Sequence, residues 1–176
     1  MKIVTLNIRH GGGRRVPEII EYLRSQRSDV IVLTEYRENA NARVLRSELA
    51  SQGLAYFAGA SIAPKENSVC ILSRLPFVPR TYPRLTTRHA HRVVSAHFGQ
   101  LAVFGVYFPQ NQAKADVFQF FISGAHKPTE DAHLVVGDLN TGLHGIDEAG
   151  STFYCADQFA ALSKIGFVDS WRSRNS

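Results

Sequence analysis

The first third of the chain alternates between short apolar runs and segments with helical periodicity. Residues 2–8 and 29–34 are apolar runs that predict strands, and the branched apolar residues 134–136 predict a buried strand. Residues 16–26 and 41–51 instead place apolar side chains three and four positions apart, which predicts helices with one buried face. The order strand, helix, strand, helix is typical of an α/β fold.

The middle of the chain follows a different pattern. Short strands without long helices between them are predicted at residues 56–57, 68–73, 93–98 and 101–107. Gly99-Gln100, between the last two strands, predicts a two-residue hairpin with glycine in the first turn position. Part of the chain is therefore expected to be antiparallel, in a mixed sheet or in two packed sheets with helices outside.

The last third returns to helical periodicity. Residues 111–126 predict a long helix that Asn111 caps, and residues 152–164 predict another that stops near Gly166. The following residues 166–172 predict a strand or turn, with Trp171 in the core. The buried positions of the two helices are predicted to be Ala113, Val117, Phe120, Phe121, Phe159 and Leu162.

Polar side chains stand at the ends of four predicted strands. Asn7, Glu35 and Tyr107 end three of them. Asp138 and Asn140 follow the fourth, a short apolar run that ends in glycine. In α/β sheets the carboxyl ends of the strands form the usual ligand crevice. If the four ends meet, they make a pocket rich in oxygen ligands, which suits Mg2+ better than zinc.

Composition narrows the class of protein without selecting a function. The 176 residues fit one domain, residues 1–176, and 44% hydrophobic with 20% charged residues is ordinary for a globular protein. The net charge of +5 favours a polyanionic partner such as nucleic acid, although it also fits a mildly basic protein without one. Cys70 and Cys155 are expected to be reduced and structural, which favours the cytoplasm. No apolar stretch reaches transmembrane length, so no membrane partner is expected, and the oligomeric state stays open.

Two loops are basic. Residues 9–15 hold three glycines and three arginines, with Arg9 first, and fit either contact with a phosphate backbone or a flexible solvated connection. The segment 86–92 offers Arg88 and Arg92 to a substrate phosphate, although a solvated loop is the simpler interpretation. Its two histidines stand two positions apart, but no third ligand nearby supports a zinc site.

Six segments, in this order, give the chain a resemblance to the endonuclease/exonuclease/phosphatase family, which includes exonuclease III-like and deoxyribonuclease I-like enzymes. GDLN after an apolar strand, with a glutamate at an earlier strand end, is fairly specific in combination, whereas each segment alone is weak. The segments are LNI at 6–8, VIVLTE at 30–35, NSVCILSR at 67–74, VYFPQN at 106–111, GDLNTG at 137–142 and GFVDSWR at 166–172.

The resemblance implies a four-layer α/β/β/α sandwich of two mixed β-sheets flanked by helices. It also implies Mg2+-dependent cleavage of phosphate esters, with Mn2+ as a possible substitute. By the same resemblance, Glu35 binds the metal and Asn7 lies beside it. Tyr107 contacts the scissile phosphate, Asp138 orients or deprotonates the attacking water, and Asn140 helps to hold phosphate or water.

The chain also departs from the family pattern. Members usually continue beyond the GFVDSWR-like segment with an Arg-Ile-Asp segment and then a Ser-Asp-His segment that supplies an essential histidine, and neither occurs here. We therefore expect the domain to be incomplete at its C-terminus, as part of a longer protein, or else to have an incomplete site. His144 is a weaker candidate to replace the missing histidine.

Three functions fit these observations. The first is a Mg2+-dependent nuclease that cleaves DNA or RNA, and the basic charge favours it. The second is the same chemistry on a small or lipid phosphoester. The third is a nucleic-acid-binding remnant without catalysis, which the absent histidine would favour.

Overall fold

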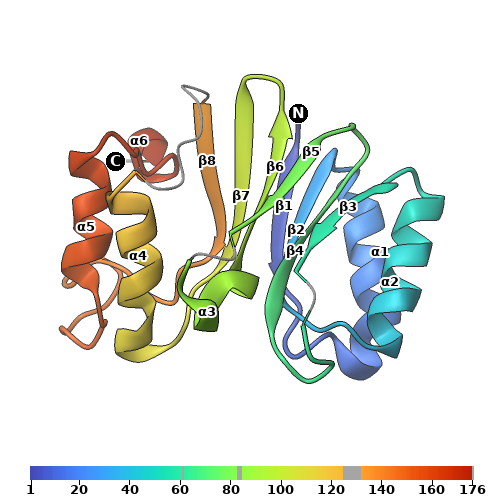
Figure 1. Cartoon of the computed structure of the whole chain (residues 1–176), viewed down its shortest axis with the longest axis horizontal. Coiled ribbons are helices and arrows are strands. Elements are labelled where there is room, and N and C mark those ends of the chain that lie inside the picture. The colour runs from blue at the N-terminus through green and yellow to red at the C-terminus, as the bar shows by residue number, and fades with distance from the viewer. Residues whose placement is uncertain (61, 83–84, 125–131, 176) are drawn as a thin grey trace. The chain divides into compact units, whose positions relative to one another are not determined.

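The structure is a computed structural model that describes residues 1–60, 62–82, 85–124 and 132–175 (Figure 1). These residues form two compact units, which we describe separately. The first unit contains Met1–Tyr107 and the strand that ends at Asp138. The second unit contains the described residues 108–124 and 139–175. Within the described residues, no helix is both long and apolar enough to span a membrane.

The first unit begins with a mixed four-stranded sheet in the order β1-β2-β4-β3. Its strands are β1 (Ile3–Asn7), β2 (Val30–Tyr36), β4 (Ser68–Ser73) and β3 (Tyr56–Gly59). The pair β1–β2 is parallel, whereas β4 runs antiparallel to both of its neighbours. The strands predicted from apolar runs are thus confirmed.

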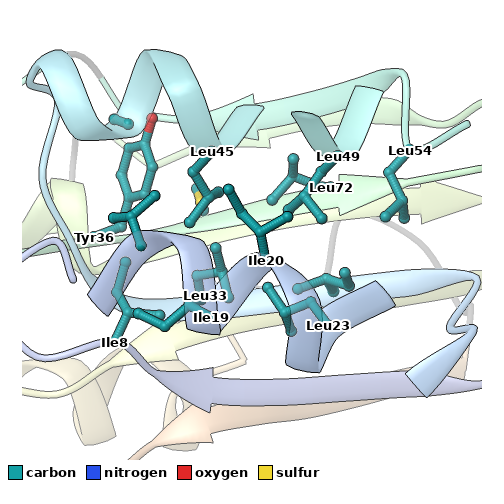
Figure 2. Close-up of a cluster of buried hydrophobic side chains, with 14 residues drawn as sticks. Ile8, Ile19, Ile20, Leu23, Leu33, Tyr36, Leu45, Leu49, Leu54 and Leu72 are labelled. Atoms are coloured by element: carbon teal, nitrogen blue, oxygen red, sulfur yellow. The ribbon is translucent and has the colours of Figure 1, made fainter. Parts of the chain in front are cut away.

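Helices α1 (Val16–Gln26) and α2 (Ala40–Ser51) cover one face of this sheet. Both were predicted, and each has the expected apolar stripe, because leucines and isoleucines three and four positions apart point at the strands in Figure 2. Helix α2 begins one residue earlier than predicted, where the side chain of Asn39 accepts a hydrogen bond from the Ala42 amide at 3.1 Å.

The second sheet of the first unit has the order β5-β6-β7-β8. Its strands are β5 (Val78–Thr81), β6 (Val93–Phe98), β7 (Leu101–Tyr107) and β8 (Ala132–Asp138). The predicted hairpin joins β6 to β7, and Gly99 has a φ of 62°, as the first position of a type II′ turn requires. The pair β7–β8 is parallel, so this sheet is mixed as well.

The two sheets pack face to face. On β2, alternate residues serve two cores: Ile31 and Leu33 face the helices, whereas Val30 and Val32 face the second sheet. Gly105 on β7 lies at this inner contact, where an added Cβ would come within 3.1 Å of Val32. The missing side chain therefore lets the sheets approach closely.

The second unit is helical and aromatic. It contains a 3₁₀ turn (Asn111–Lys114) followed by α4 (Ala115–Ile122), and later α5 (Ala156–Lys164) and the short α6 (Arg172–Asn175). The rings of Phe118 on α4 and Phe159 on α5 meet edge to face with centroids 6.4 Å apart. This aromatic contact helps to hold α4 against α5.

Several details of the predicted helix 111–126 are wrong. The segment is a 3₁₀ turn followed by α4, and residues 125–126 lie outside the described part of the chain. Asn111 does not cap it, since its own φ is 53° and it belongs to the turn. Ala113 is exposed, whereas the neighbouring Lys114 is buried, because a 3₁₀ turn presents a different face from an α-helix.

Three other predictions need correction. Residues 86–92 form two short helical turns, α3 (Thr86–His89) and a 3₁₀ turn (Ala90–Arg92), rather than a solvated loop. The two histidines of this segment lie on these turns, where His91 is buried. Trp171 is 69% exposed and is not part of the core. Strand β8 is only half-buried, because it occupies an edge of its sheet.

Gly137 offers a sharp test of the β7–β8 pairing. Its φ is 144°, and an added Cβ would lie 2.0 Å from the carbonyl oxygen of Val106. We expect Gly137→Ala to lower the free energy of unfolding by about 3 kcal/mol or more, because strain and collision with backbone add. Gly99→Ala is the matched control, since its φ is also positive but no atom lies within 4 Å of the added Cβ. Equal losses in a denaturant titration would contradict the pairing geometry.

Candidate functional site

Parallel pairing aligns the strand ends of the first unit two by two. In the first sheet, Asn7 at the end of β1 pairs with Thr34 of β2, one residue before Glu35. In the second sheet, Tyr107 at the end of β7 pairs with Asp138 at the end of β8. The face-to-face packing of the sheets then decides whether the two pairs meet.

The side-chain amide of Asn7 joins the two pairs. Its Nδ2 donates hydrogen bonds to Glu35 Oε1 at 3.0 Å and to Asp138 Oδ2 at 3.1 Å. Its Oδ1 accepts from the backbone N–H of Arg9 at 2.9 Å, which sets the orientation of the amide. The structure therefore brings the two predicted carboxylates together around one nitrogen.

Glu35 occupies a strained position. It is the extra residue of a β-bulge between Thr34 and Tyr36, and its φ is 54°. For a residue other than glycine, a left-handed backbone costs about 1–2 kcal/mol. The side chain is only 15% exposed, and Oε2 accepts hydrogen bonds from the His10 amide at 2.9 Å and from Asn67 Nδ2 at 3.2 Å. The bulge therefore aims the carboxylate away from the strand ladder and holds it there.

The glycine-rich segment after β1 is an ordered, strained turn. All five residues from Arg9 to Gly13 have positive φ values, including the two that are not glycine. The N–H of Gly11 donates to the backbone carbonyl of Glu35 at 2.8 Å. This segment is therefore tied to β2 by a backbone hydrogen bond, and the Arg9 side chain is exposed, whereas its contact with a phosphate backbone stays a prediction.

Arg92 lies against Tyr107. Its guanidinium carbon is 4.8 Å from the centre of the tyrosine ring, which is a cation–π contact. The contact follows from register, because Val93 of β6 pairs with Val106 of β7 and so places the preceding arginine next to the tyrosine. Arg88 is exposed on α3. Of these two predicted arginines, Arg92 is thus the one that the structure ties to a strand end of the site.

Asn140 belongs to the second unit and is held on both sides of its amide. Its Oδ1 accepts from Gln110 Nε2 at 2.6 Å, and its Nδ2 donates to the carbonyl of Phe108 at 2.7 Å. The ammonium group of the buried Lys114 donates to the backbone carbonyl of Asn140. Asn140 has a left-handed backbone, with a φ of 52°.

Sequence reasoning missed the residues that hold Glu35 from its other side. Asn67 comes just before β4, at the amino end of an antiparallel strand. The rule that ligands bind at the carboxyl ends of strands does not predict a site residue there. Arg37 donates to Asn67 Oδ1 at 2.6 Å, and His10 lies next to both. A usable signal was the NSVCILSR segment, which places Asn67 directly before a buried strand.

A separate loop of the second unit is organised around Glu148. Its carboxylate accepts hydrogen bonds from the Thr152 amide at 2.7 Å, from the Phe153 amide at 3.0 Å and from His144 Nδ1 at 2.7 Å. Asp147, beside it, accepts from the Leu143 amide and pairs with an arginine of α6. The two acidic residues therefore stabilise the loop and are not simple surface charges, and His144 is engaged in the same network.

The chain belongs to the endonuclease/exonuclease/phosphatase family, whose model matches residues 4–159. Among solved structures, it is similar to an AP endonuclease from Archaeoglobus fulgidus, with a TM-score of 0.78 and 17% identity. It is also similar to a 3′-5′ exonuclease from Neisseria meningitidis, with a TM-score of 0.73 and 20% identity. Both matches cover 98% of this chain and 74% of the other. No curated protein matches the sequence.

The resemblance seen in the sequence is thus confirmed, and so is the predicted fold class, an α/β fold with two mixed β-sheets flanked by helices. As the family name states, its members are nucleases and phosphatases, which hydrolyse phosphate esters. A structure bound to a product DNA hairpin, a 3′ phosphatase from Neisseria, is also similar, with a TM-score of 0.73 and 21% identity.

Asn7 can be tested by a single added charge. Asn7→Asp keeps an acceptor for Arg9 but replaces the shared donor with a third carboxylate, so we expect it to be about 1–2 kcal/mol less stable than Asn7→Leu at pH 7 without divalent cations. Chemical denaturation of the two variants at pH 7 measures the difference. Equal stabilities of the two variants would contradict the bridging geometry.

Glu148 makes a prediction about acid stability. Its desolvation alone raises the pKa, but hydrogen bonds from Thr152, Phe153 and His144 outweigh this and lower the pKa to about 2. A depressed folded-state pKa stabilises the protein above the ordinary value of 4.5, and this stabilisation is lost as the pH falls toward 2. Glu148→Gln should therefore be less stable than the natural protein at pH 7, and the two should converge near pH 2. Glu48→Gln, at an exposed site on α2, should show no such convergence.

Proposed function

We propose that the protein is a Mg2+-dependent phosphodiester hydrolase that acts on nucleic acid. The observation that carries the proposal is the meeting of Glu35 and Asp138 on the two sides of the Asn7 amide. Both carboxylates lie within hydrogen-bond distance of one nitrogen, so their negative charges repel each other. A divalent cation bound between them would offset this repulsion and would explain the strained backbone of Glu35.

The donors present fit Mg2+, or Mn2+ in its place. Glu35 would hold the cation through Oε1, which accepts a hydrogen bond from Asn7, while Oε2 is kept in place by His10 and Asn67. The Oδ1 of Asn7 faces the Arg9 amide, so Asn7 acts as a donor beside the cation unless its amide turns over. Among the described residues, no three His, Cys, Asp or Glu side chains come together to hold a metal ion, so the proposed cation would have one or two carboxylates and several waters as ligands, as Mg2+ commonly does.

The other site residues have separate roles in phosphate binding and hydrolysis. When bound, the cation would neutralise phosphate charge and the charge that develops on the leaving oxygen. Asp138, held by Asn7, orients or deprotonates the attacking water. Tyr107, packed under Arg92, offers its hydroxyl to the scissile phosphate, and Asn140 holds phosphate or water. Positioning and electrostatics do most of the catalysis in this scheme.

Nucleic acid is the substrate that charge and similarity favour. The chain carries a net charge of +5, and Arg9, Arg88 and Arg92 are candidate contacts to a phosphate backbone. Similar structures are named as nucleases, and one is bound to a DNA hairpin. Both cysteines are free, which supports work in a reducing compartment such as the cytoplasm.

Cleavage assays test the proposal directly. With Mg2+, the protein should cut at least one member of a panel of duplex DNA, abasic duplex, single strand and RNA, and EDTA should abolish the cutting. Glu35→Gln and Asp138→Asn should each lower kcat/KM by roughly 100-fold or more, because each removes a charge that acts on the transition state. Glu21→Gln, an exposed glutamate on α1, should leave it unchanged.

Two results would count against the proposal. Full activity in both site variants would remove these carboxylates from the reaction. Cleavage of small phosphoesters alone, with every nucleic acid left intact, would replace nucleic acid by a small phosphoester as the substrate.

A further inference from the structure

His10 places an exposed imidazole beside the Glu35 carboxylate. The His10 side chain is 67% exposed, although its backbone belongs to the strained turn that follows β1. Its Nδ1 lies 2.9 Å from a terminal nitrogen of Arg37, 3.0 Å from Asn67 Nδ2 and 3.2 Å from Glu35 Oε2. One side of the ring is thus fixed while the other faces solvent.

The partners of Nδ1 determine where the ring carries its proton. A guanidinium group can only donate, so Arg37 requires Nδ1 to accept. The amide of Asn67 is oriented by the same arginine, whose Nε donates to Asn67 Oδ1 at 2.6 Å, so its Nδ2 is a donor too. With Nδ1 as the acceptor, the ring has its hydrogen on Nε2.

This tautomer limits what Nε2 can do. Its lone pair is not available, so it cannot be a metal ligand in this state, but it is a hydrogen-bond donor. Each of these polar contacts of the His10 ring with the described residues involves Nδ1, so none of them occupies the Nε2 donor. A fixed donor next to a carboxylate that would hold a cation is well placed for an anionic oxygen bound to that cation.

We propose that His10 is a substrate-binding residue whose Nε2–H donates to a non-bridging oxygen of the substrate phosphate, beside Glu35. Strain at Arg9 and His10, together with the hydrogen bond from the His10 amide to Glu35, keeps the donor and the carboxylate in one rigid piece. The inference rests on the proposed phosphodiester hydrolysis and adds to it a phosphate contact made by a ring N–H.

Two substitutions separate the two sides of the ring. The amide of glutamine reaches the position of Nε2 and can donate there, whereas the amide of asparagine reaches only the position of Nδ1. His10→Gln should therefore retain most of the activity, and His10→Asn should lower kcat/KM by roughly 10- to 100-fold, the effect of one hydrogen bond to a charged group. The loss should be mainly in KM, because the contact already exists with bound substrate.

The experiment measures kcat and KM of the natural protein, His10→Gln and His10→Asn on the best nucleic-acid substrate. Retention in His10→Gln with loss in His10→Asn supports the proposal. The reverse order overturns it, because it would show that the ring serves to hold Arg37 and Asn67. Equal activities overturn it as well.

Failure of the proposed function would look different. If the natural protein cleaves nothing, the affinity of the three proteins for a fluorescent single-stranded oligonucleotide with Mg2+ gives the same comparison. Weaker binding by His10→Asn than by His10→Gln would support the proposed phosphate contact, even though the proposed hydrolysis would be wrong. Equal binding would contradict the proposed phosphate contact as well.

Discussion

Close packing between the inner faces of the two sheets is the contact on which the site depends. Alternation along β2 sends Val30 and Val32 toward the second sheet, and Gly105 of β7 leaves room for the sheets to approach. Only because the sheets meet in this way can Asn7, at the end of β1, contact Asp138, at the end of β8. Tight packing of small and branched side chains between the sheets thus fixes the positions of the polar side chains at the strand ends.

Backbone strain is concentrated around the acidic centre. Glu35, Arg9 and His10 all have left-handed backbones, and hydrogen bonds between the turn and the bulge tie the three together. A fold tolerates such strain where surrounding contacts over-determine the conformation, here the well-packed core below Glu35. The result is a carboxylate with little freedom, which lowers the cost of ordering it around a cation or a phosphate.

The prediction of secondary structure succeeded where packing and local pattern agree. Strands β4, β6 and β7 are buried runs, and α1 has one clean apolar stripe, so their limits follow from the sequence. Strand β5 was missed because it is mostly exposed and contains Pro79, which suits an edge. The segment 86–92 was wrongly predicted to be a solvated loop, because its residues are mostly polar. It forms two helical turns, and His91 is buried.

By itself, the sequence determined the α/β class and, through the order of six short segments, the family, and it placed Glu35 and Asp138 at strand ends, because strand ends and glycine turns are local signals. Tertiary structure alone decided that Asn7 bridges Glu35 and Asp138, that the turn after β1 is strained, and that Asn67, Arg37 and His10 form one network. Such contacts join residues 27 to 131 positions apart along the chain. No local pattern encodes them, since they depend on register, on a bulge and on the packing of two sheets.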